Sequence, residues 1–308
     1  MKGGHMNPRK LYITKSSKIL NISHHDMDGV ACSIVLANTF DRDCLTYWYA
    51  TYRDIDEIIK RTNFDNYDYV IMTDISPHDP TLIEGKDNLI LLDHHETALP
   101  LHNLNKKRNV VIGQCAGLLT QDFCERLFGI SLSYLDDFLK VVNDYDMWIN
   151  NDQRGKELNE LFYLYWGHRF RKRFLDGHIM YTENEKEYLK QRQIELTSMY
   201  EDLQFYPLEK INAAIICANS RINDLCDSIL MKEGYDIVFC RIPKTHSISV
   251  RTNLDTIHIG NILREYDPLS GGGHARAGAI ENNGTKQFQT IITELENIIY
   301  TKLQKKGK

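Results

Sequence analysis

The chain has 308 residues, of which 42% are hydrophobic and 26% are charged, and its formal net charge is −5. This composition is ordinary for a globular protein and excludes a fibrous or largely disordered chain. The negative net charge excludes a broadly basic protein that coats nucleic acid, but it permits a local positive or metal site for an anionic substrate. The length predicts two domains, at about 150 residues per domain.

Location can also be predicted from the sequence. No apolar run approaches the roughly 20 residues that a membrane-spanning helix needs. We interpret Met1–His5 as a cloning remnant, and the N-terminal MKGGHMNPRK lacks the apolar stretch of a secretory signal. The seven cysteines include no CxxC pair, which favours reduced thiols. We therefore expect a cytoplasmic protein without membrane association.

Short apolar runs alternate with helical stretches in the first half of the chain. Strands are predicted at Lys18–Ser23, Leu45–Thr51, Tyr67–Thr73, Asn88–Leu92 and Asn109–Ile112. Helices are predicted at Val30–Thr39, Asp54–Arg61, Cys115–Phe128 and Leu132–Asn143. Such alternation implies a mainly parallel sheet that is covered by helices on both faces.

A helical pattern runs from Lys156 to about Phe205, and Thr182 and Glu185 within it form a capping-box signature. This pattern predicts a long connecting helix, which Pro207 ends. A second α/β unit follows. Its predicted elements are strands at Lys210–Ala218, Asp236–Ile242 and Ser247–Thr252, helices at Ile222–Glu233, Ile257–Tyr266 and Lys286–Leu303, and a turn at Gly271–Gly273. The predicted fold class is therefore α/β, with a mainly parallel-sheet N-terminal domain joined by a long helix to a smaller α/β domain.

Acidic and histidine side chains directly follow three of the predicted strands. They occur in SHHDMDG (His24, His25, Asp26, Asp28), in TDISP (Asp74) and in LLDHHET (Asp93, His94, His95), and NDYDMW adds Asp144 or Asp146. Ligand sites in open α/β sheets collect at the carboxyl ends of strands, so we expect these clusters to form one site. A single Asp after a strand is often only a turn former. Three such clusters together favour a metal site.

The donor types in these clusters indicate which metal would bind. Carboxylates mixed with imidazoles suit Mn²⁺ or a similar divalent ion, with Mg²⁺ or Co²⁺ as alternatives. The clusters contain no thiolate, which disfavours a structural zinc site. Two ions about 4 Å apart can activate water and neutralise charge on a transferring phosphoryl group.

A glycine-rich segment near the C-terminus is the last candidate site. SGGGHARAG contains Gly272, Gly273, His274 and Arg276, and Arg251 lies upstream in SISVRTN, at the end of a predicted strand. Consecutive glycines allow close backbone approach and can present N–H groups to an anion, although a flexible turn would have the same composition. Their combination with an arginine-bearing strand favours an anion-binding site.

The motifs DMD, TDISP, DHH, YDMW and then SVRT with GGGHARAG, in this order, resemble the DHH phosphoesterases that carry a C-terminal DHHA1 domain. The resemblance runs from about Lys18 to Gly278. It implies a DHH catalytic domain over residues 6–180, a linker helix over 181–208 and a DHHA1 substrate-binding domain over 209–308. The family includes RecJ-type exonucleases, nanoRNases, phosphatases of adenosine 3′,5′-bisphosphate and cyclic-dinucleotide phosphodiesterases. The compact length and the SHHDMDG motif are most similar to the nanoRNase branch.

The resemblance also implies a role for each motif residue. Asp26 and Asp28 would each ligate a different ion, Asp74 would bridge both ions, and His94 and Asp146 would be further ligands. Two further residues would be catalytic: His95 would contact the scissile phosphate, and Asp93 would orient the imidazoles. The substrate would be bound by Arg251, Gly272, Gly273 and His274.

The chain departs from the family pattern at one position. Many members carry a histidine four residues before the first Asp of the first motif, and this chain has Ile22 there. His24 or His25 would then have to substitute, or one ion would bind more weakly. A nucleotide-binding module without turnover remains an alternative for this reason.

The predicted function is hydrolysis of phosphodiester bonds in short oligonucleotides, in which water activated by two metal ions attacks phosphorus. The predicted partner is a short single-stranded RNA or DNA oligonucleotide or a nucleotide, and a homodimer is left open. Alternative substrates are longer single strands, cyclic or linear dinucleotides and nucleoside 3′,5′-bisphosphates. Pyrophosphate is disfavoured, because the resemblance of GGGHARAG to DHHA1 differs from the pyrophosphatase branch.

Basic and aromatic residues interleave in HRFRKRF, from His168 to Phe174. This composition suits phosphate contact and base stacking. A solvated basic helix face whose aromatic residues belong to the core is the favoured interpretation.

Overall fold

The computed structural model of the chain describes residues 12–102, 107–282, 284 and 286–306. The expectations for Met1–His5 and for the secretory signal concern residues outside these ranges. The chain forms two compact units, and each is described here by itself. Unit 1 contains Met1–His94, Ala98–Asp146 and Asp152–Ile179, and unit 2 contains His95–Thr97, Met147–Asn151 and Met180–Lys308.

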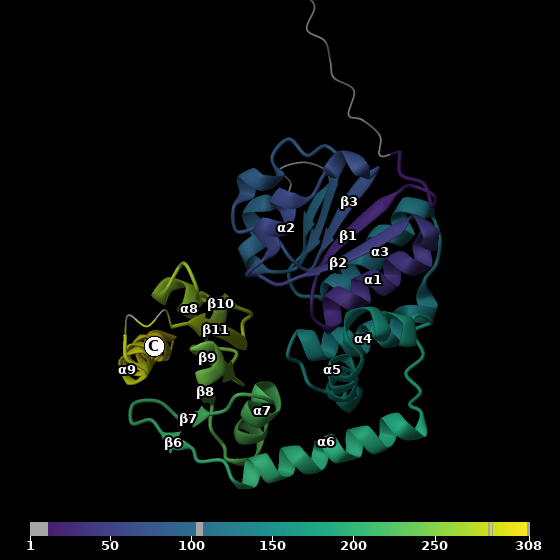
Figure 1. Cartoon of the computed structure of the whole chain (residues 1–308). Coiled ribbons are helices and arrows are strands. Elements are labelled where there is room, and N and C mark those ends of the chain that lie inside the picture. The colour runs from purple at the N-terminus through teal and green to yellow at the C-terminus, as the bar shows by residue number, and fades with distance from the viewer. Residues whose placement is uncertain (1–11, 103–106, 283, 285, 307–308) are drawn as a thin grey trace, which may run out of the picture. The chain divides into compact units, whose positions relative to one another are not determined.

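A five-stranded sheet forms the centre of unit 1, in the order β2-β1-β3-β4-β5, and every neighbouring pair is parallel (Figure 1). Its strands are β1 (Ile19–His24), β2 (Leu45–Ala50), β3 (Tyr69–Thr73), β4 (Leu89–Asp93) and β5 (Arg108–Val110). The three central strands are buried almost completely. Their near-continuous apolar sequences are typical of parallel strands that are covered on both faces. The predicted parallel sheet is therefore confirmed.

Helices cover both faces of this sheet. They are α1 (Met27–Thr39), α2 (Ile55–Arg61), α3 (Ala116–Phe128), α4 (Asp136–Asp146) and α5 (Gln153–Arg173). Figure 1 shows α2 on one side of the sheet and α1 with α3 on the other. Almost every residue of α1 is buried, because this helix packs against α3, α4 and α5 as well as the sheet. A helix that is apolar on all sides is expected at such a central position.

The prediction of one long helix from Lys156 to Phe205 is wrong. Helix α5 ends at Arg173, and a separate helix, α6 (Glu183–Glu201), begins after Thr182. The capping box explains the new start: the Thr182 hydroxyl accepts a hydrogen bond from the Glu185 N–H at 3.3 Å, and the Glu185 carboxylate accepts one from the Thr182 N–H at 2.7 Å. These two bonds satisfy N–H groups that a helix start otherwise leaves without a partner.

Unit 2 contains a six-stranded sheet in the order β10-β11-β9-β8-β7-β6, in which only the β7–β8 pair is parallel. The strands are β6 (Tyr206–Pro207), β7 (Ala213–Cys217), β8 (Ile237–Ile242), β9 (Ser247–Thr252), β10 (Gly272–Gly273) and β11 (Ala277–Glu281). The further helices are α7 (Ile222–Lys232), α8 (Ile259–Tyr266) and α9 (Phe288–Lys306). Strands β10 and β11 were not expected, because β10 consists of two glycines and β11, with the sequence AGAIE, is mostly alanine and glycine, which are uncommon in strands.

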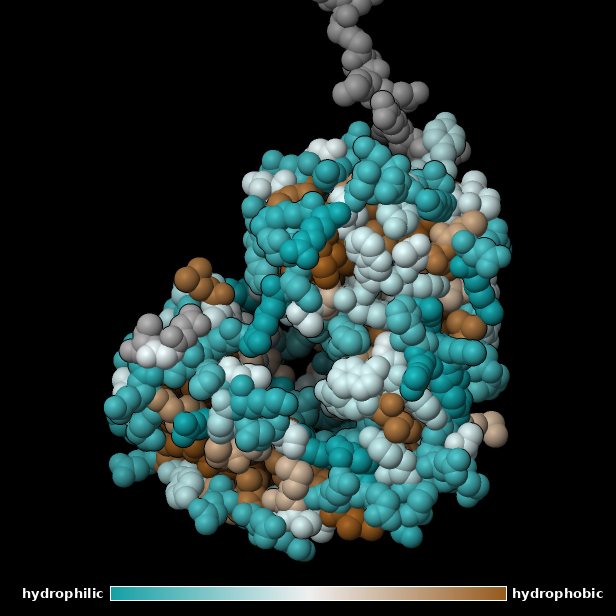
Figure 2. Space-filling view, in the orientation of Figure 1, coloured by the Kyte–Doolittle hydropathy of each residue, from teal (hydrophilic) through white to brown (hydrophobic). Residues whose placement is uncertain are grey.

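The surface of the molecule is mainly hydrophilic on the face that Figure 2 shows, with hydrophobic residues gathered around β6 and β7. Among the described residues, no helix is both long enough and apolar enough to cross a bilayer. The α/β fold class is confirmed for both units. The domain boundaries at residues 180 and 208 stay a prediction.

Candidate metal centre

The candidate site lies at the carboxyl edge of the sheet in unit 1. Strand β1 pairs with β2 on one side and with β3 on the other, so the direction in which strands are added reverses there. Reversal points of this kind place two loops side by side, and ligands bind between them in open α/β sheets. The predicted polar clusters follow β1, β3 and the next strand, β4.

The loop after β1 brings His24 and Asp26 together. Asp26 caps α1, because one of its carboxylate oxygens, Oδ1, accepts a hydrogen bond from the Gly29 N–H at 2.9 Å. The other oxygen, Oδ2, lies 2.7 Å from His24 Nδ1. Burial disfavours a charge on His24, but the adjacent Asp26 carboxylate outweighs it and raises the pKa of His24 well above its ordinary value.

Asp28 occupies the first turn of α1 and is buried. Its two carboxylate oxygens accept hydrogen bonds from the first N–H groups of α3, at 2.7 Å from Ala116 and 2.9 Å from Gly117. Anionic groups are stabilised at helix N-termini, so α3 fixes this carboxylate in place. Its Oδ2 also lies 3.8 Å from His94 Nε2. Burial among other carboxylates raises the pKa of Asp28.

Asp74 directly follows β3 and connects the two sides of the cluster. Its backbone has φ +61°, in the left-handed region that few non-glycine residues adopt, and its N–H donates to Leu92 O at 2.9 Å. The buried carboxylate places Oδ1 at 3.1 Å from His94 Nε2 and Oδ2 at 3.7 Å from His24 Nδ1. One oxygen therefore faces each histidine.

Asp93 and His94 end β4. Asp93 is fully buried, and its Oδ1 accepts a hydrogen bond from the His94 N–H at 2.7 Å, while its Oδ2 accepts one from the Ser76 hydroxyl. These contacts fix the turn that positions the His94 ring. Ser76 belongs to the TDISP motif, but no role was predicted for it from the sequence.

The structure distinguishes the two candidates in NDYDMW. Asp146, at the end of α4, has its Oδ2 at 3.5 Å from His94 Nε2. Burial, together with the nearby Asp74 and Asp26 carboxylates, raises the pKa of Asp146 to about 7. Asp144 instead accepts a hydrogen bond from the Asp152 N–H at 2.9 Å. Of these two aspartates, Asp146 is the one that belongs to the acidic and histidine cluster.

The cluster forms two donor groups. Group A contains His24, Asp26 and Asp74, and group B contains Asp28, His94 and Asp146, and in each group the donor atoms lie within 4.8 Å of one another. Four buried or partly buried carboxylates gather here around two histidines. Oxygen and imidazole donors in this proportion match first-row divalent ions.

The arrangement also clarifies the departure at Ile22. This side chain is fully buried in the core on the α2 side of the sheet, so it takes no part in the cluster. His24 occupies group A, whereas His25 stacks on Tyr49 with a centroid distance of 5.5 Å. Of the two substitutes considered, His24 is the one placed to donate to an ion.

Arg251 in unit 2 is held by the protein itself. Its Nη1 donates to Ser249 Oγ at 2.8 Å, to Val250 O at 2.9 Å and to Gly278 O at 3.2 Å. Its Nη2 donates to Asn223 Oδ1 at 2.6 Å. All four acceptors are neutral, so the positive charge of Arg251 is not compensated by these contacts.

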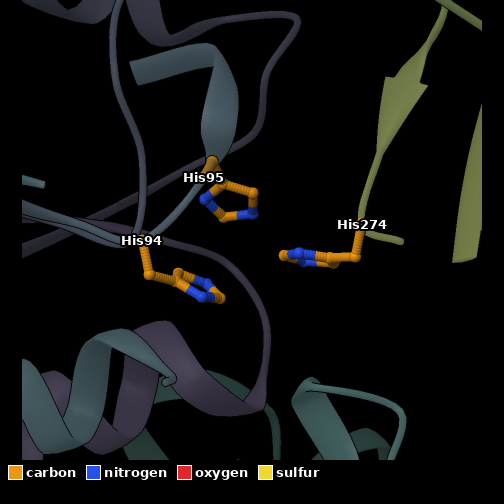
Figure 3. A group of neighbouring side chains, drawn as sticks. All are labelled: His94, His95 and His274. Carbon is orange, nitrogen blue, oxygen red and sulfur yellow. The ribbon is translucent and has the colours of Figure 1, made fainter. Parts of the chain in front are cut away.

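Gly272 and Gly273 form β10, and the turn that follows is tight. Gly273 has φ +134°, and a Cβ there would lie 2.3 Å from Ala277 O. Glycine is therefore required at this position for packing alone. The His274 N–H donates to Ala277 O at 2.7 Å. The centroid of the His274 ring lies 5.0 Å from that of the His95 ring, and Figure 3 shows these two rings as neighbours.

Comparison with known proteins gives one curated relative and a set of similar structures. Oligoribonuclease NrnB of Bacillus subtilis is 23% identical over 291 residues, which cover 83% of this chain and 70% of the relative. RecJ from Thermus thermophilus, solved with Mn²⁺, superposes with a TM-score of 0.60 and 14% identity, over 92% of this chain and 52% of RecJ. A DHH domain from a member of the s1p family of ribosomal proteins gives a TM-score of 0.61 and 15% identity, over 93% of this chain and 87% of that one.

No family model matches the chain. The structural likenesses establish the fold, and the curated relative extends over most of the sequence. The acidic and histidine residues of the sequence motifs are gathered at one edge of the sheet in unit 1. The chain therefore shares the fold of RecJ and of the DHH domain, and over most of its length it is similar in sequence to an oligoribonuclease.

Proposed function

We propose that the chain is a divalent-metal-dependent hydrolase of phosphodiester bonds in short single-stranded oligonucleotides. The observation that carries this proposal is the position of the Asp74 carboxylate between two histidines. Its two oxygens face two different donor groups, at 3.1 Å from His94 Nε2 and 3.7 Å from His24 Nδ1. A carboxylate in this position can bridge two cations, as a two-ion phosphoesterase site requires.

The proposed ligands follow the two donor groups. His24, Asp26 and Asp74 would hold one ion, and Asp28, His94 and Asp146, again with Asp74, would hold the other. The α3 N–H groups occupy one lone pair on each Asp28 oxygen and leave another for an ion. Two such ions would lower the pKa of water and stabilise the charge that develops on the phosphoryl oxygens.

The remaining residues would position these ligands and the substrate. Asp93, held by the Ser76 hydroxyl, orients the His94 turn. The resemblance assigns His95 to the scissile phosphate, and it assigns Arg251, Gly272, Gly273 and His274 to the other end of the substrate. The guanidinium of Arg251 suits an anion, but a substrate would have to compete with the hydrogen bonds that it already makes.

Manganese is the proposed ion. The mixture of carboxylate oxygens and imidazole nitrogens favours it over a purely oxygen-loving cation. RecJ from Thermus thermophilus has been solved both with Mn²⁺ and, at a TM-score of 0.54, with Mg²⁺. Both ions therefore belong in any test of this chain.

Short oligonucleotides are the proposed substrates for two reasons. The curated relative is described as an oligoribonuclease, and the match covers most of both chains. The second reason is the first motif, SHHDMDG, which resembles the form found in the nanoRNase branch.

The decisive experiment compares two aspartates that lie two residues apart in α4. Purified protein with Mn²⁺ or Mg²⁺ is given linear dinucleotides, longer single strands, a cyclic dinucleotide and a nucleoside 3′,5′-bisphosphate. We expect Asp146→Asn to lower kcat/KM at least about 100-fold, because even residues that only support metal ligands contribute about 10- to 100-fold.

Asp144→Asn is the matched control, because its side-chain oxygen can still accept the Asp152 N–H hydrogen bond. We expect it to retain activity. Equal losses in both variants, or none in either, would contradict the proposed metal centre. Preference for a longer strand, a cyclic dinucleotide or a bisphosphate would keep the chemistry and reassign the substrate.

A further inference from the structure

Helix α5 contains a strained residue that the proposed chemistry does not use. Trp166 has φ +54° and ψ 159° inside the helical span Gln153–Arg173, which is thereby divided. A non-glycine residue in such a conformation persists only where the surrounding structure holds it, and it often marks a functional position. The strain turns the indole outward, and 53% of Trp166 is exposed.

The packing of the next residue explains how this break is held. Gly167 is buried, and a Cβ there would lie 2.8 Å from the Tyr49 ring of β2. The second half of α5 can therefore approach the sheet only with glycine at this position. Further along, Phe170 and Phe174 are fully buried, which confirms that the aromatic residues of HRFRKRF belong to the core.

Trp166 extends a row of rings that begins next to the candidate metal centre. His25 directly precedes Asp26 of group A, and its ring lies between Tyr49 and Trp166, at centroid distances of 5.5 and 5.6 Å. Tyr163, which is 50% exposed, packs edge-on against Trp166 at 5.7 Å. Two exposed aromatic side chains thus stand beside the residue that leads into group A.

The same segment of α5 is also rich in positive charge. The span 161–174 contains Arg169, Arg171, Lys172 and Arg173 and no acidic residue. Because Phe170 and Phe174 point into the core, Arg169 and Lys172 are exposed. The Arg171 guanidinium lies over the Tyr47 ring at 3.4 Å from its centroid. The segment thus offers rings for bases and cations for phosphates, which is the combination that binding of single-stranded nucleic acid needs.

We propose that the indole of Trp166, supported by His25, is a stacking site for one nucleobase of a single-stranded substrate, and that Arg169 and Lys172 contact its phosphates. This inference rests on the proposed function, and it adds which part of unit 1 receives a nucleotide next to the metal centre. Stacking on an indole is available to every base, so the site selects for an unpaired nucleotide and not for a base type.

The test measures binding without turnover. Fluorescently labelled oligonucleotides are titrated in EDTA, and one abasic residue is moved along the strand. We expect the wild-type chain to lose about 5- to 100-fold in affinity at one abasic position, the range that base–aromatic stacking provides. Trp166→Ala should weaken binding of the intact strand by the same factor and should abolish the effect of that abasic position.

Two variants control this experiment. Tyr134→Ala removes another exposed aromatic residue of unit 1, from the short helix Ser133–Leu135, and should leave affinity unchanged. Trp166→Phe keeps a ring and should retain most of the abasic effect. Lys172→Ala should reduce the slope of log affinity against log salt by about one, as loss of one phosphate contact does.

The outcomes separate this inference from the proposed function. If Trp166→Ala keeps the full abasic effect while Asp146→Asn still abolishes hydrolysis, the stacking site is wrong and the phosphoesterase stands. If the chain hydrolyses none of the substrates and binds no oligonucleotide, the proposed function itself fails. Equal melting temperatures of the Trp166 variants and the wild type exclude unfolding as the cause of weaker binding.

Discussion

The charged groups of the two units have opposite surroundings. In unit 1, Asp28, Asp74 and Asp146 lie buried or nearly so around His94, and like charges face one another. In unit 2, the one charge of Arg251 is distributed over neutral acceptors. The first arrangement costs free energy unless cations complete it, whereas the second is satisfied within the fold. The comparison teaches that the carboxylate cluster of unit 1 favours the binding of cations, whereas the Arg251 guanidinium is already held by hydrogen bonds within unit 2.

The largest expected effect tests the bridging carboxylate. Asp74→Asn should lower kcat/KM by at least about 1,000-fold, because removing one electrostatic group at a reacting centre costs about 100- to 1,000-fold and Asp74 faces both donor groups. Metal analysis of the purified variant should show fewer than two bound ions. A variant that keeps both ions and its activity would remove the basis for a two-ion site.

Removal of metal should sharpen the contrast between the units. After chelation, addition of Mn²⁺ at about 100 times its dissociation constant should stabilise the native chain by about 2.7 kcal/mol. Hydrogen exchange should slow mainly at the ends of β1, β3 and β4, and much less in β8 and β9. The Asp74→Asn variant serves as the control, and equal protection of both units would contradict an ion site in unit 1.

Ser76→Ala tests whether the hydrogen bond from Ser76 to Asp93 helps to position the proposed ligand His94. The hydroxyl donates to Asp93, which in turn holds the turn of His94. Loss of such an outer partner should reduce metal affinity or activity about 10- to 100-fold. Ser76→Thr, which keeps the hydroxyl, should recover part of the loss. Metal titration followed by calorimetry would decide, and an unchanged affinity and rate would show that Asp93 needs no such support.

The smallest expected effect concerns unit 2. Asn223→Ala removes the acceptor of Arg251 Nη2 and should lower the free energy of unfolding by about 1 kcal/mol, the net contribution of a typical hydrogen bond. Metal-induced stabilisation should not change. Urea unfolding with and without Mn²⁺ measures both quantities. A loss of metal-induced stabilisation in this variant would mean that the contacts of Arg251 and the acidic cluster of unit 1 depend on each other.

Much of the fold was predictable from local sequence patterns. The apolar runs before His24, Asp74 and Asp93 identified β1, β3 and β4, because parallel strands that are covered on both faces have continuous apolar sequences. The prediction failed where local patterns were ambiguous. Helical periodicity continued through 174–182, and only the capping box at Thr182 indicated the second helix.

The candidate site was predictable as a set of residue types but not as a geometry. The motifs named Asp26, Asp74, His94 and Asp146, and the structure gathers them in unit 1. The residue types alone left Asp144 and Asp146 open, and the resemblance favoured Asp146. The structure distinguishes them, because both lie in the last turns of α4 and their side chains have different partners. The position of Trp166 required the structure, since no sequence pattern predicts a positive φ for tryptophan.

The sequence alone determined the main strands and helices of unit 1 and the chemical types of the donors, because both follow from side-chain periodicity and from motifs that are local in the chain. Only the tertiary structure decided which oxygen faces which imidazole, that His24 lies beside Asp26 and Asp74 while Ile22 lies in the core, and that Arg251 donates to neutral acceptors. These outcomes depend on contacts between residues that are distant in the chain, and such contacts exist only after the sheet has assembled.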